Sequence, residues 1–187
     1  MKPNVFIIHG AYGCPNENWF SWLKNKLDDE RIECFVPHFP TPKEQSLENW
    51  LQIFDSYRYK ISEKSILIGH SLGAVFLLRW LEIWSGVKIN KCFLIGGFLG
   101  KVNVALFDIL NRDFFIHPFN WHNIKMKVDE FILYHGNDDP YVSHEYANSL
   151  TASLNATKIV VANAGHFNKA SGYKSFPLLW THLQKVL

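Results

Sequence analysis

Short, uninterrupted apolar runs alternate along this chain with segments whose apolar residues recur every three or four positions. These runs, four of which begin with one polar residue, lie at residues 5–8, 33–36, 65–68, 91–95, 131–134 and 158–161. The segments with helical spacing lie at residues 19–27, 46–54, 74–84, 144–154 and 176–187. Continuously apolar strands are typical of a parallel sheet that is buried on both faces, with helices in the connections. The sequence therefore predicts an α/β fold, a three-layer α/β/α sandwich around a mostly parallel sheet.

Length and charge narrow the function classes. No repeat or Gly/Ser linker divides the 187 residues, so we expect a single domain over residues 1–187. The 19 basic and 17 acidic residues nearly balance, which argues against a nucleic-acid or anionic-membrane partner. The apolar run before His9 is too short for a signal peptide or a membrane span, and the three cysteines lack a C-x-x-C pairing. These features predict a cytoplasmic protein.

One serine stands between two glycines at the end of the third apolar run, in the sequence Gly69-His70-Ser71-Leu72-Gly73. A strand that turns abruptly into a helix strains the residue at the turn, and the flanking glycines allow the close approach that such a turn needs. The following helix directs free backbone N–H groups at the same point, where they can stabilise an anion. Ser71 is therefore the candidate nucleophile, with a turn serine of no catalytic role as the alternative.

A serine hydroxyl needs a base to remove its proton and an acid to orient that base. We prefer His166 among the nine histidines because it follows the last apolar run and Gly165, in a loop that can reach across the crevice. His135 also ends an apolar run, but it precedes the acidic pair, and the usual order after such an elbow is serine, acid, histidine. No two histidines have the H-E-x-x-H spacing of a metal site, so we expect no metal.

The acid is one of two neighbouring aspartates that follow the fifth apolar run. Pro140 biases Asp139 toward an extended backbone, which favours projection of its side chain from the loop. Asp139 is therefore the preferred acid, and Asp138 is the alternative. A third possibility is that both residues only build the turn and cap the next helix.

Four short segments resemble a known family. The sequences FIIHG (6–10), GHSLG (69–73), GNDDP (136–140) and GHF (165–167) are similar to those of small α/β-hydrolases of the YdeN and retinoblastoma-binding-protein-nine type. The likeness extends over nearly the whole chain. It implies the α/β-hydrolase fold with a minimal cap, and serine hydrolase activity on ester-like substrates.

Carried over to this sequence, the resemblance implies Ser71 as nucleophile, Asp139 as acid and His166 as base. It also implies an oxyanion hole formed by the backbone N–H groups of Ala11 and Leu72. The expected reaction is the cleavage of small carboxylic esters through an acyl-enzyme, with no cofactor. An amidase or peptidase with the same groups, or a protein-binding module on a hydrolase scaffold, is the alternative. The expected partner is a small-molecule ester or acyl compound, and no protein partner is named by the sequence.

The segment 97–128 lies where α/β-hydrolases often insert a cap, and here it is short. Its aromatic residues include Phe98, Phe114, Phe115, Phe119 and Trp121. They form either a wall over the acyl pocket or a seal between the connecting segment and the sheet, and the sequence leaves both interpretations open. A short cap predicts a shallow pocket and a preference for short acyl chains.

Overall fold

The computed structural model describes residues 2–187 and places six strands in one parallel sheet. The strands are β1 (Val5–Ile8), β2 (Cys34–Phe35), β3 (Ile66–His70), β4 (Ile89–Ile95), β5 (Val128–Gly136) and β6 (Thr157–Val161). Their order across the sheet is β2-β1-β3-β4-β5-β6, and all neighbours are parallel. In this register Ile68 lies between Ile7 of β1 and Phe93 of β4. The prediction of an α/β fold with a parallel sheet is confirmed.

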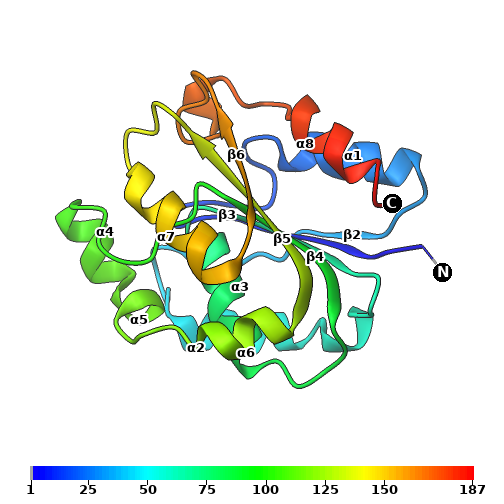
Figure 1. Cartoon of the computed structure of the whole chain (residues 1–187), viewed down its shortest axis with the longest axis horizontal. Coiled ribbons are helices and arrows are strands. Elements are labelled where there is room, and N and C mark those ends of the chain that lie inside the picture. Colours follow the sequence, from blue (N-terminus) through cyan, green and yellow to red (C-terminus); the bar gives the residue numbers. More distant parts are fainter. Residues whose placement is uncertain (1) are drawn as a thin grey trace.

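Helices cover both faces of the sheet. They are α1 (Phe20–Asp29), α2 (Leu47–Asp55), α3 (Leu72–Ile83), α4 (Ala105–Leu110), α5 (Arg112–Phe115), α6 (Trp121–Met126), α7 (His144–Leu154) and α8 (Pro177–Leu183), with 3₁₀ turns η1 (Arg58–Lys60) and η2 (Lys169–Ser171). Figure 1 shows α1 and α8 together on one face, with α2, α3 and α6 on the other. The Ser46 side chain caps α2 by accepting a hydrogen bond from the Asn49 N–H at 3.1 Å.

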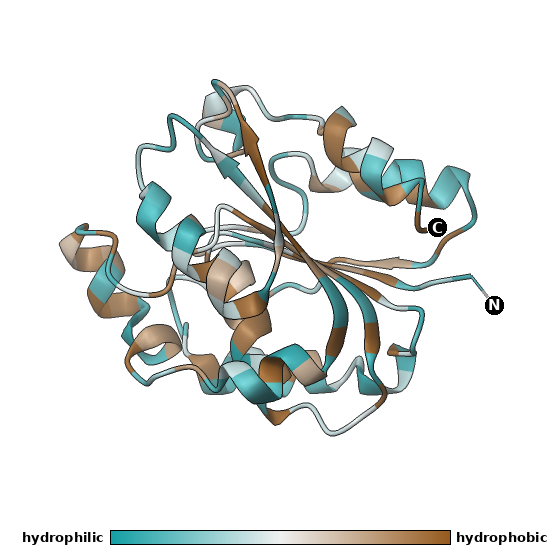
Figure 2. Ribbon diagram, viewed as in Figure 1, coloured by the Kyte–Doolittle hydropathy of each residue, from teal (hydrophilic) through white to brown (hydrophobic). Residues whose placement is uncertain are grey.

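The central strands are largely apolar because each face of the sheet packs into its own core. Along β1, Val5 and Ile7 lie in the core under α1 and α8, whereas Phe6 and Ile8 lie in the core under α2 and α3. All four side chains are fully buried, and Figure 2 shows the same apolar character in the other central strands. Burying a side chain of this size contributes about 1.5–3 kcal/mol. This double burial removes the polar alternation that a one-sided sheet would show.

A buried arginine fastens the connection between β4 and β5. Arg79 of α3 donates hydrogen bonds to the carbonyl oxygens of Phe114 at 2.8 Å and Pro118 at 3.2 Å, and also to that of His117. Its charge is paired with Glu82 at 2.9 Å. The segment 97–128 is therefore tied at its middle to the core of the domain.

Within residues 2–187, no helix has the length and apolar character needed to cross a membrane.

Candidate active site

Ser71 occupies the sharp turn between β3 and α3. Its backbone angles, φ 56° and ψ −121°, are rare for a residue with a side chain, and such a conformation costs on the order of 1–3 kcal/mol. A Cβ on Gly73 would lie 2.3 Å from the carbonyl oxygen of Ile8, and one on Gly69 would lie 2.6 Å from that of Gly73. Only glycine fits at either position, so the sequence reasoning about the glycines is confirmed.

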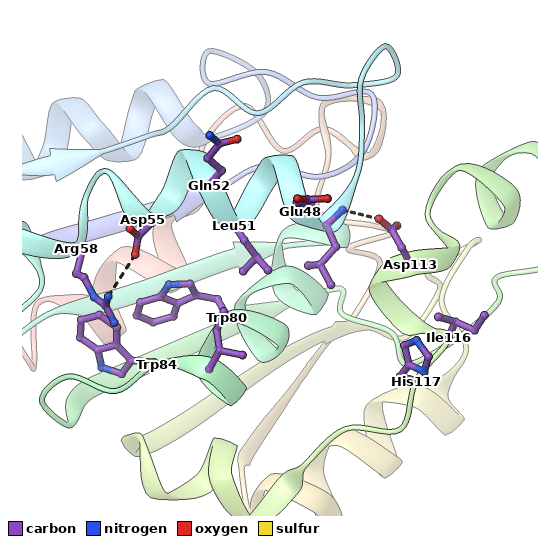
Figure 3. Close-up of a pocket in the computed structure, with 12 residues that line it drawn as sticks. Glu48, Leu51, Gln52, Asp55, Arg58, Trp80, Trp84, Asp113, Ile116 and His117 are labelled. Carbon is purple, nitrogen blue, oxygen red and sulfur yellow. Dashed lines mark hydrogen bonds and ion pairs between the residues drawn. The ribbon is translucent and has the colours of Figure 1, made fainter.

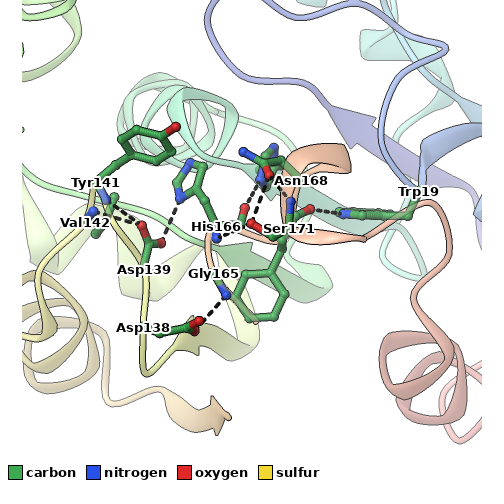
Figure 4. A network of polar contacts seen from close by, with 11 residues as sticks. Trp19, Asp138, Asp139, Tyr141, Val142, Gly165, His166, Asn168 and Ser171 are labelled. Atoms are coloured by element: carbon green, nitrogen blue, oxygen red, sulfur yellow. Dashed lines mark hydrogen bonds and ion pairs between the residues drawn. The ribbon is translucent and has the colours of Figure 1, made fainter. Parts of the chain in front are cut away.

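His166 and Asp139 meet across the loops that follow β6 and β5. The His166 Nδ1 lies 2.7 Å from the Asp139 Oδ2, and the side chains are 8% and 0% exposed. Figure 4 shows the Asp139 carboxylate between the imidazole and the backbone of the next residues. Its Oδ1 accepts hydrogen bonds from the N–H groups of Tyr141 at 2.9 Å and Val142 at 3.0 Å. An ionised carboxylate can only accept, so Nδ1 carries the imidazole proton and Nε2 is left with a free lone pair.

Two opposing effects set the pKa of Asp139. Burial raises the pKa of the carboxyl group. The hydrogen bond and charge of His166 and the two backbone N–H groups together lower it by more than burial raises it, so the pKa lies below its ordinary value. The carboxyl group therefore stays ionised at neutral pH.

Asp138, the alternative acid, points elsewhere. Its Oδ1 accepts a hydrogen bond from the Gly165 N–H at 2.8 Å, so it contacts the backbone of the loop that carries His166 (Figure 4). His135, the alternative base, is buried and packs with its ring centroid 4.5 Å from that of His144. Neither residue contacts the imidazole of His166 by a hydrogen bond within the described chain.

Two further contacts hold the carbonyl groups of the loop that carries His166. The His70 Nε2 donates to the His166 carbonyl oxygen at 2.8 Å, and the Trp19 Nε1 donates to the Phe167 carbonyl oxygen at 3.0 Å. Burial lowers the pKa of His70 to about 3, so this histidine is neutral at all but strongly acid pH. The sequence gives no signal for either contact, because each joins residues about one hundred or more positions apart.

The turn after β1 is held by His9. Its Nε2 accepts a hydrogen bond from the Phe39 N–H at 3.1 Å, so Nδ1 carries the proton and donates to the Gly10 carbonyl oxygen at 2.8 Å. In a trans peptide the carbonyl and the following N–H point in opposite directions, so the Ala11 N–H points away from His9. Among residues 2–187, neither the Ala11 N–H nor the Leu72 N–H has a hydrogen-bond acceptor. Two donors without an acceptor thus lie beside Ser71, one in the turn after β1 and one at the first residue of α3.

The two buried histidines, His9 and His70, should make the fold sensitive to acid. Burial lowers the pKa of His9 to about 4 and that of His70 to about 3, from 6.5. Below 6.5 the unfolded chain binds protons that the folded chain does not, so stability is lost as the pH falls toward these values. We expect the free energy of unfolding to fall by about 2 kcal/mol between about pH 6.5 and 5.5, measured by urea unfolding. His9→Gln, which cannot titrate, should remove about half of this loss. A wild-type free energy of unfolding that is the same at pH 6.5 and pH 5.5 would contradict the expectation.

Ser71 and His166 line one cavity of about 630 Å³. Its apolar wall comes from the connection after β4 and from the loop after β5, and includes Phe98, Val102, Val104, Leu106, Phe107 and Val142. Its polar wall comes from the segments before α1 and after β6, and includes Glu17, Asn18, Asn168 and Lys169. Ala11 and Tyr12 of the turn after β1 complete the lining.

Of the two interpretations that the sequence leaves open for the aromatic residues of segment 97–128, the wall fits one of the five. Phe98 lines the cavity, but Phe114, Phe115, Phe119 and Trp121 do not. Phe114 is fully buried against Trp50, with ring centroids 5.1 Å apart. The Cζ of Arg79 lies 3.7 Å from the centroid of the Phe119 ring. The Trp121 ring packs on the Phe119 ring, with centroids 5.0 Å apart.

Phe115 is half-buried and lines a separate surface hollow beside Ile109 and Ile116. Its ring packs against Phe98, with centroids 6.1 Å apart. For Phe114, Phe119 and Trp121 as well, the interpretation as a seal is therefore the one that the structure supports.

Two residues beside His166 escaped the sequence reasoning. Gly96, at the end of β4, has φ +59°, and a Cβ there would lie 3.0 Å from the His166 Cε1. The Tyr141 ring packs edge-on against the imidazole, with centroids 5.3 Å apart. The Gly96-Gly97 pair directly after an apolar run was the available signal for a close approach at that strand end.

A larger groove of about 890 Å³ lies elsewhere, between α2, the end of α3 and the region of α5 (Figure 3). Trp80 and Trp84 form part of it, and Arg58 pairs with Asp55 there at 3.7 Å. It contains none of the proposed reacting groups, so the smaller cavity is the candidate active site. In the part of the chain that the structure describes, no cluster of three or more His, Cys, Asp or Glu residues could hold a metal ion.

A family model described as "Serine hydrolase" matches residues 5–185 of this chain. The chain is 26% identical to the protein YdeN of Bacillus subtilis over 182 residues, which cover 96% of this chain and 94% of YdeN. It is 23% identical to the serine hydrolase RBBP9 of Rattus norvegicus over 183 residues, again 96% of this chain and 94% of the relative.

Two solved structures superpose on this chain. The crystal structure of the B. subtilis ydeN gene product superposes with a TM-score of 0.91 at 26% identity, covering 99% of this chain and 98% of that one. Est1E of Butyrivibrio proteoclasticus, solved with bound ferulic acid, superposes with a TM-score of 0.68 at 13% identity, covering 96% of this chain and 90% of that one. The second match shows a shared fold alone.

Proposed function

This chain belongs to the serine hydrolase family, and we propose that it cleaves small carboxylic esters with Ser71 as nucleophile, His166 as base and Asp139 as acid. The observation that carries the proposal is the 2.7 Å contact between the buried Asp139 carboxylate and His166, in a cavity that His166 shares with Ser71. A strained serine, an imidazole with a free Nε2 and a dedicated carboxylate are the groups that acyl transfer to water requires.

In the first half of the reaction, the Ser71 Oγ attacks the ester carbonyl carbon while its proton passes to the His166 Nε2. Asp139 holds the imidazole in the tautomer that can accept this proton, and its negative charge stabilises the imidazolium. Collapse of the tetrahedral intermediate breaks the bond to the leaving alcohol, which takes the proton from Nε2. The acyl group remains on Ser71.

In the second half, a water molecule gives its proton to Nε2 as its oxygen attacks the acyl-enzyme. The second tetrahedral intermediate releases the carboxylic acid and returns the proton to the Ser71 Oγ. The enzyme ends in its starting state, and no cofactor enters the balance.

The negative oxygen of each intermediate needs donors that are in place before the reaction. We propose the N–H groups of Ala11 and Leu72, because both lack acceptors in the described chain. The hydrogen bond from His9 to the Gly10 carbonyl supports this role by fixing the plane of the Gly10–Ala11 peptide. Loss of one such donor typically raises the barrier by about 2.7–4 kcal/mol.

Chain-length selectivity tests the proposal on the wild-type protein. We expect a higher kcat/KM on p-nitrophenyl butyrate than on the palmitate below its aggregation threshold, because the 630 Å³ cavity is open beyond its apolar wall and water would surround the rest of a long chain. The matching p-nitroanilide, with a poorer leaving group, is the control for ester against amide. Absence of turnover of all three compounds by folded protein would favour the protein-binding alternative, and a preference for palmitate would show a longer acyl channel.

A further inference from the structure

Helix α4, beside the mouth of the candidate active site, buries its one charged side chain and exposes two of its aliphatic ones. Its aspartate, Asp108, is buried and accepts a hydrogen bond from the Val102 N–H at 2.9 Å. Its Leu106 and Ile109 point outward and are 78% and 73% exposed. A surface helix normally buries its apolar side chains and exposes its charges. The hydrogen bond of Asp108 and the packing of the half-buried Phe107 on the core hold the helix in this orientation, which leaves Leu106 and Ile109 exposed.

The two exposed side chains of α4 differ in what they face. Leu106 lines the cavity that contains Ser71 and His166, whereas Ile109 lines a separate hollow beside Phe115. Val104, which precedes the helix and is 47% exposed, lines the same cavity as Leu106. An apolar surface thus runs from the candidate reaction centre out to α4.

Aromatic rings connect the turn after β1 with α4 along this surface. The Phe107 ring lies 5.8 Å from that of Phe98 and 6.3 Å from that of Tyr12. Tyr12 is held at φ 58°, a strained value for tyrosine, and its N–H donates a hydrogen bond to the Thr41 Oγ1 at 2.6 Å. Strain that persists beside a reaction centre is a common mark of a side chain held in place for binding.

We propose that Val104, Leu106 and Phe107 form the acyl-binding wall of this enzyme, and that its substrates are esters of medium-length aliphatic acids whose chains reach Leu106. The inference rests on the proposed function and adds the substrate class. The acyl chain covers Leu106, which explains why a leucine is exposed there. The leaving alcohol lies toward Glu17 and Lys169 on the polar wall. Because each buried methylene contributes about 0.8 kcal/mol, kcat/KM should rise with chain length until the chain passes Leu106. It should then fall for much longer chains such as palmitoyl, whose remaining methylenes gain no contact and still lose freedom on binding.

The test compares two equivalent changes on one helix, Leu106→Ser and Ile109→Ser. The kcat/KM of each variant is measured on p-nitrophenyl acetate and hexanoate, both kept monomeric. For Leu106→Ser, we expect the ratio of hexanoate to acetate to fall about five- to tenfold, mainly through KM. For Ile109→Ser, which is similarly exposed but lies outside the cavity, the ratio should stay within about twofold of wild type.

The outcomes separate the inference from the proposed function. A ratio that Leu106→Ser leaves unchanged, or that Ile109→Ser lowers as much, would overturn the acyl wall while wild-type ester turnover still supports the function. Wild-type protein without Ser71-dependent turnover would overturn both. Thermal unfolding of the two variants is measured alongside, and an equal Tm for both assigns any difference in the ratio to binding.

Discussion

Ser71→Ala is expected to abolish ester turnover and labelling by a fluorophosphonate probe, while the circular dichroism spectrum stays that of the wild type. The probe forms a covalent bond only with an activated serine, and the variant keeps the Cβ that the turn already accommodates. A loss of kcat by a factor on the order of 10⁴ or more is usual when the nucleophile of such a set is removed. Mass spectrometry of the labelled wild-type peptide identifies the modified residue.

Ser143→Ala provides the matched control. Ser143 precedes α7, is exposed, and makes no side-chain hydrogen bond to cap that helix. This variant should label and turn over ester as the wild type does. Labelling of a different residue, or none in folded wild-type protein, would contradict the role of Ser71 and favour a binding protein on a hydrolase scaffold.

The second large effect is expected at the acid. Asp139→Asn should lower kcat by about 10⁴, because an amide can donate to the His166 Nδ1 and so stabilise the tautomer whose Nε2 carries the proton. That tautomer cannot accept a proton from Ser71. Steady-state kinetics on p-nitrophenyl butyrate measure the effect, and circular dichroism checks the fold.

Asp138, the neighbouring aspartate, provides the matched control for Asp139→Asn. In Asp138→Asn the amide oxygen still accepts the hydrogen bond that the Gly165 N–H donates to the carboxylate, so we expect less than about a tenfold loss. If Asp138→Asn proved the more damaging change, the two roles would be exchanged and the assignments of Ser71 and His166 would stand.

The sheet was predictable because burial on both faces leaves a direct trace in the sequence. The starts of β4 and β5 were missed because they carry polar side chains, Asn90 in β4 and Asp129 and Glu130 in β5. Lys91 of β4 and Glu130 of β5 face each other across the two strands as an ion pair. Because only residues 131–134 of β5 form an apolar run, a search for such runs begins this strand at residue 131, whereas the structure begins it at Val128. The single domain over residues 1–187 stays a prediction.

Part of the candidate active site was predictable from the sequence and part was not. Ser71, Asp139 and His166 follow the ends of β3, β5 and β6, and the carboxyl ends of parallel strands lie at one edge of a sheet. Their proximity therefore follows from local patterns and topology, while their roles stay predictions. The acyl wall did not follow, because α4 buries Asp108 and exposes Leu106, the opposite of what their polarity suggests.

The contact between the loops after β5 and β6 limits how this molecule can change over evolution. A Cβ on Gly136 would lie 2.1 Å from the Gly165 carbonyl oxygen, and Asp138 bonds the same glycine's N–H. An insertion or deletion in either loop would shift the acid relative to the base, so these loops must keep their lengths together. The connection that carries α4 supplies none of the three proposed reacting groups, and it can therefore be exchanged to give new substrate preferences while the chemistry is inherited unchanged.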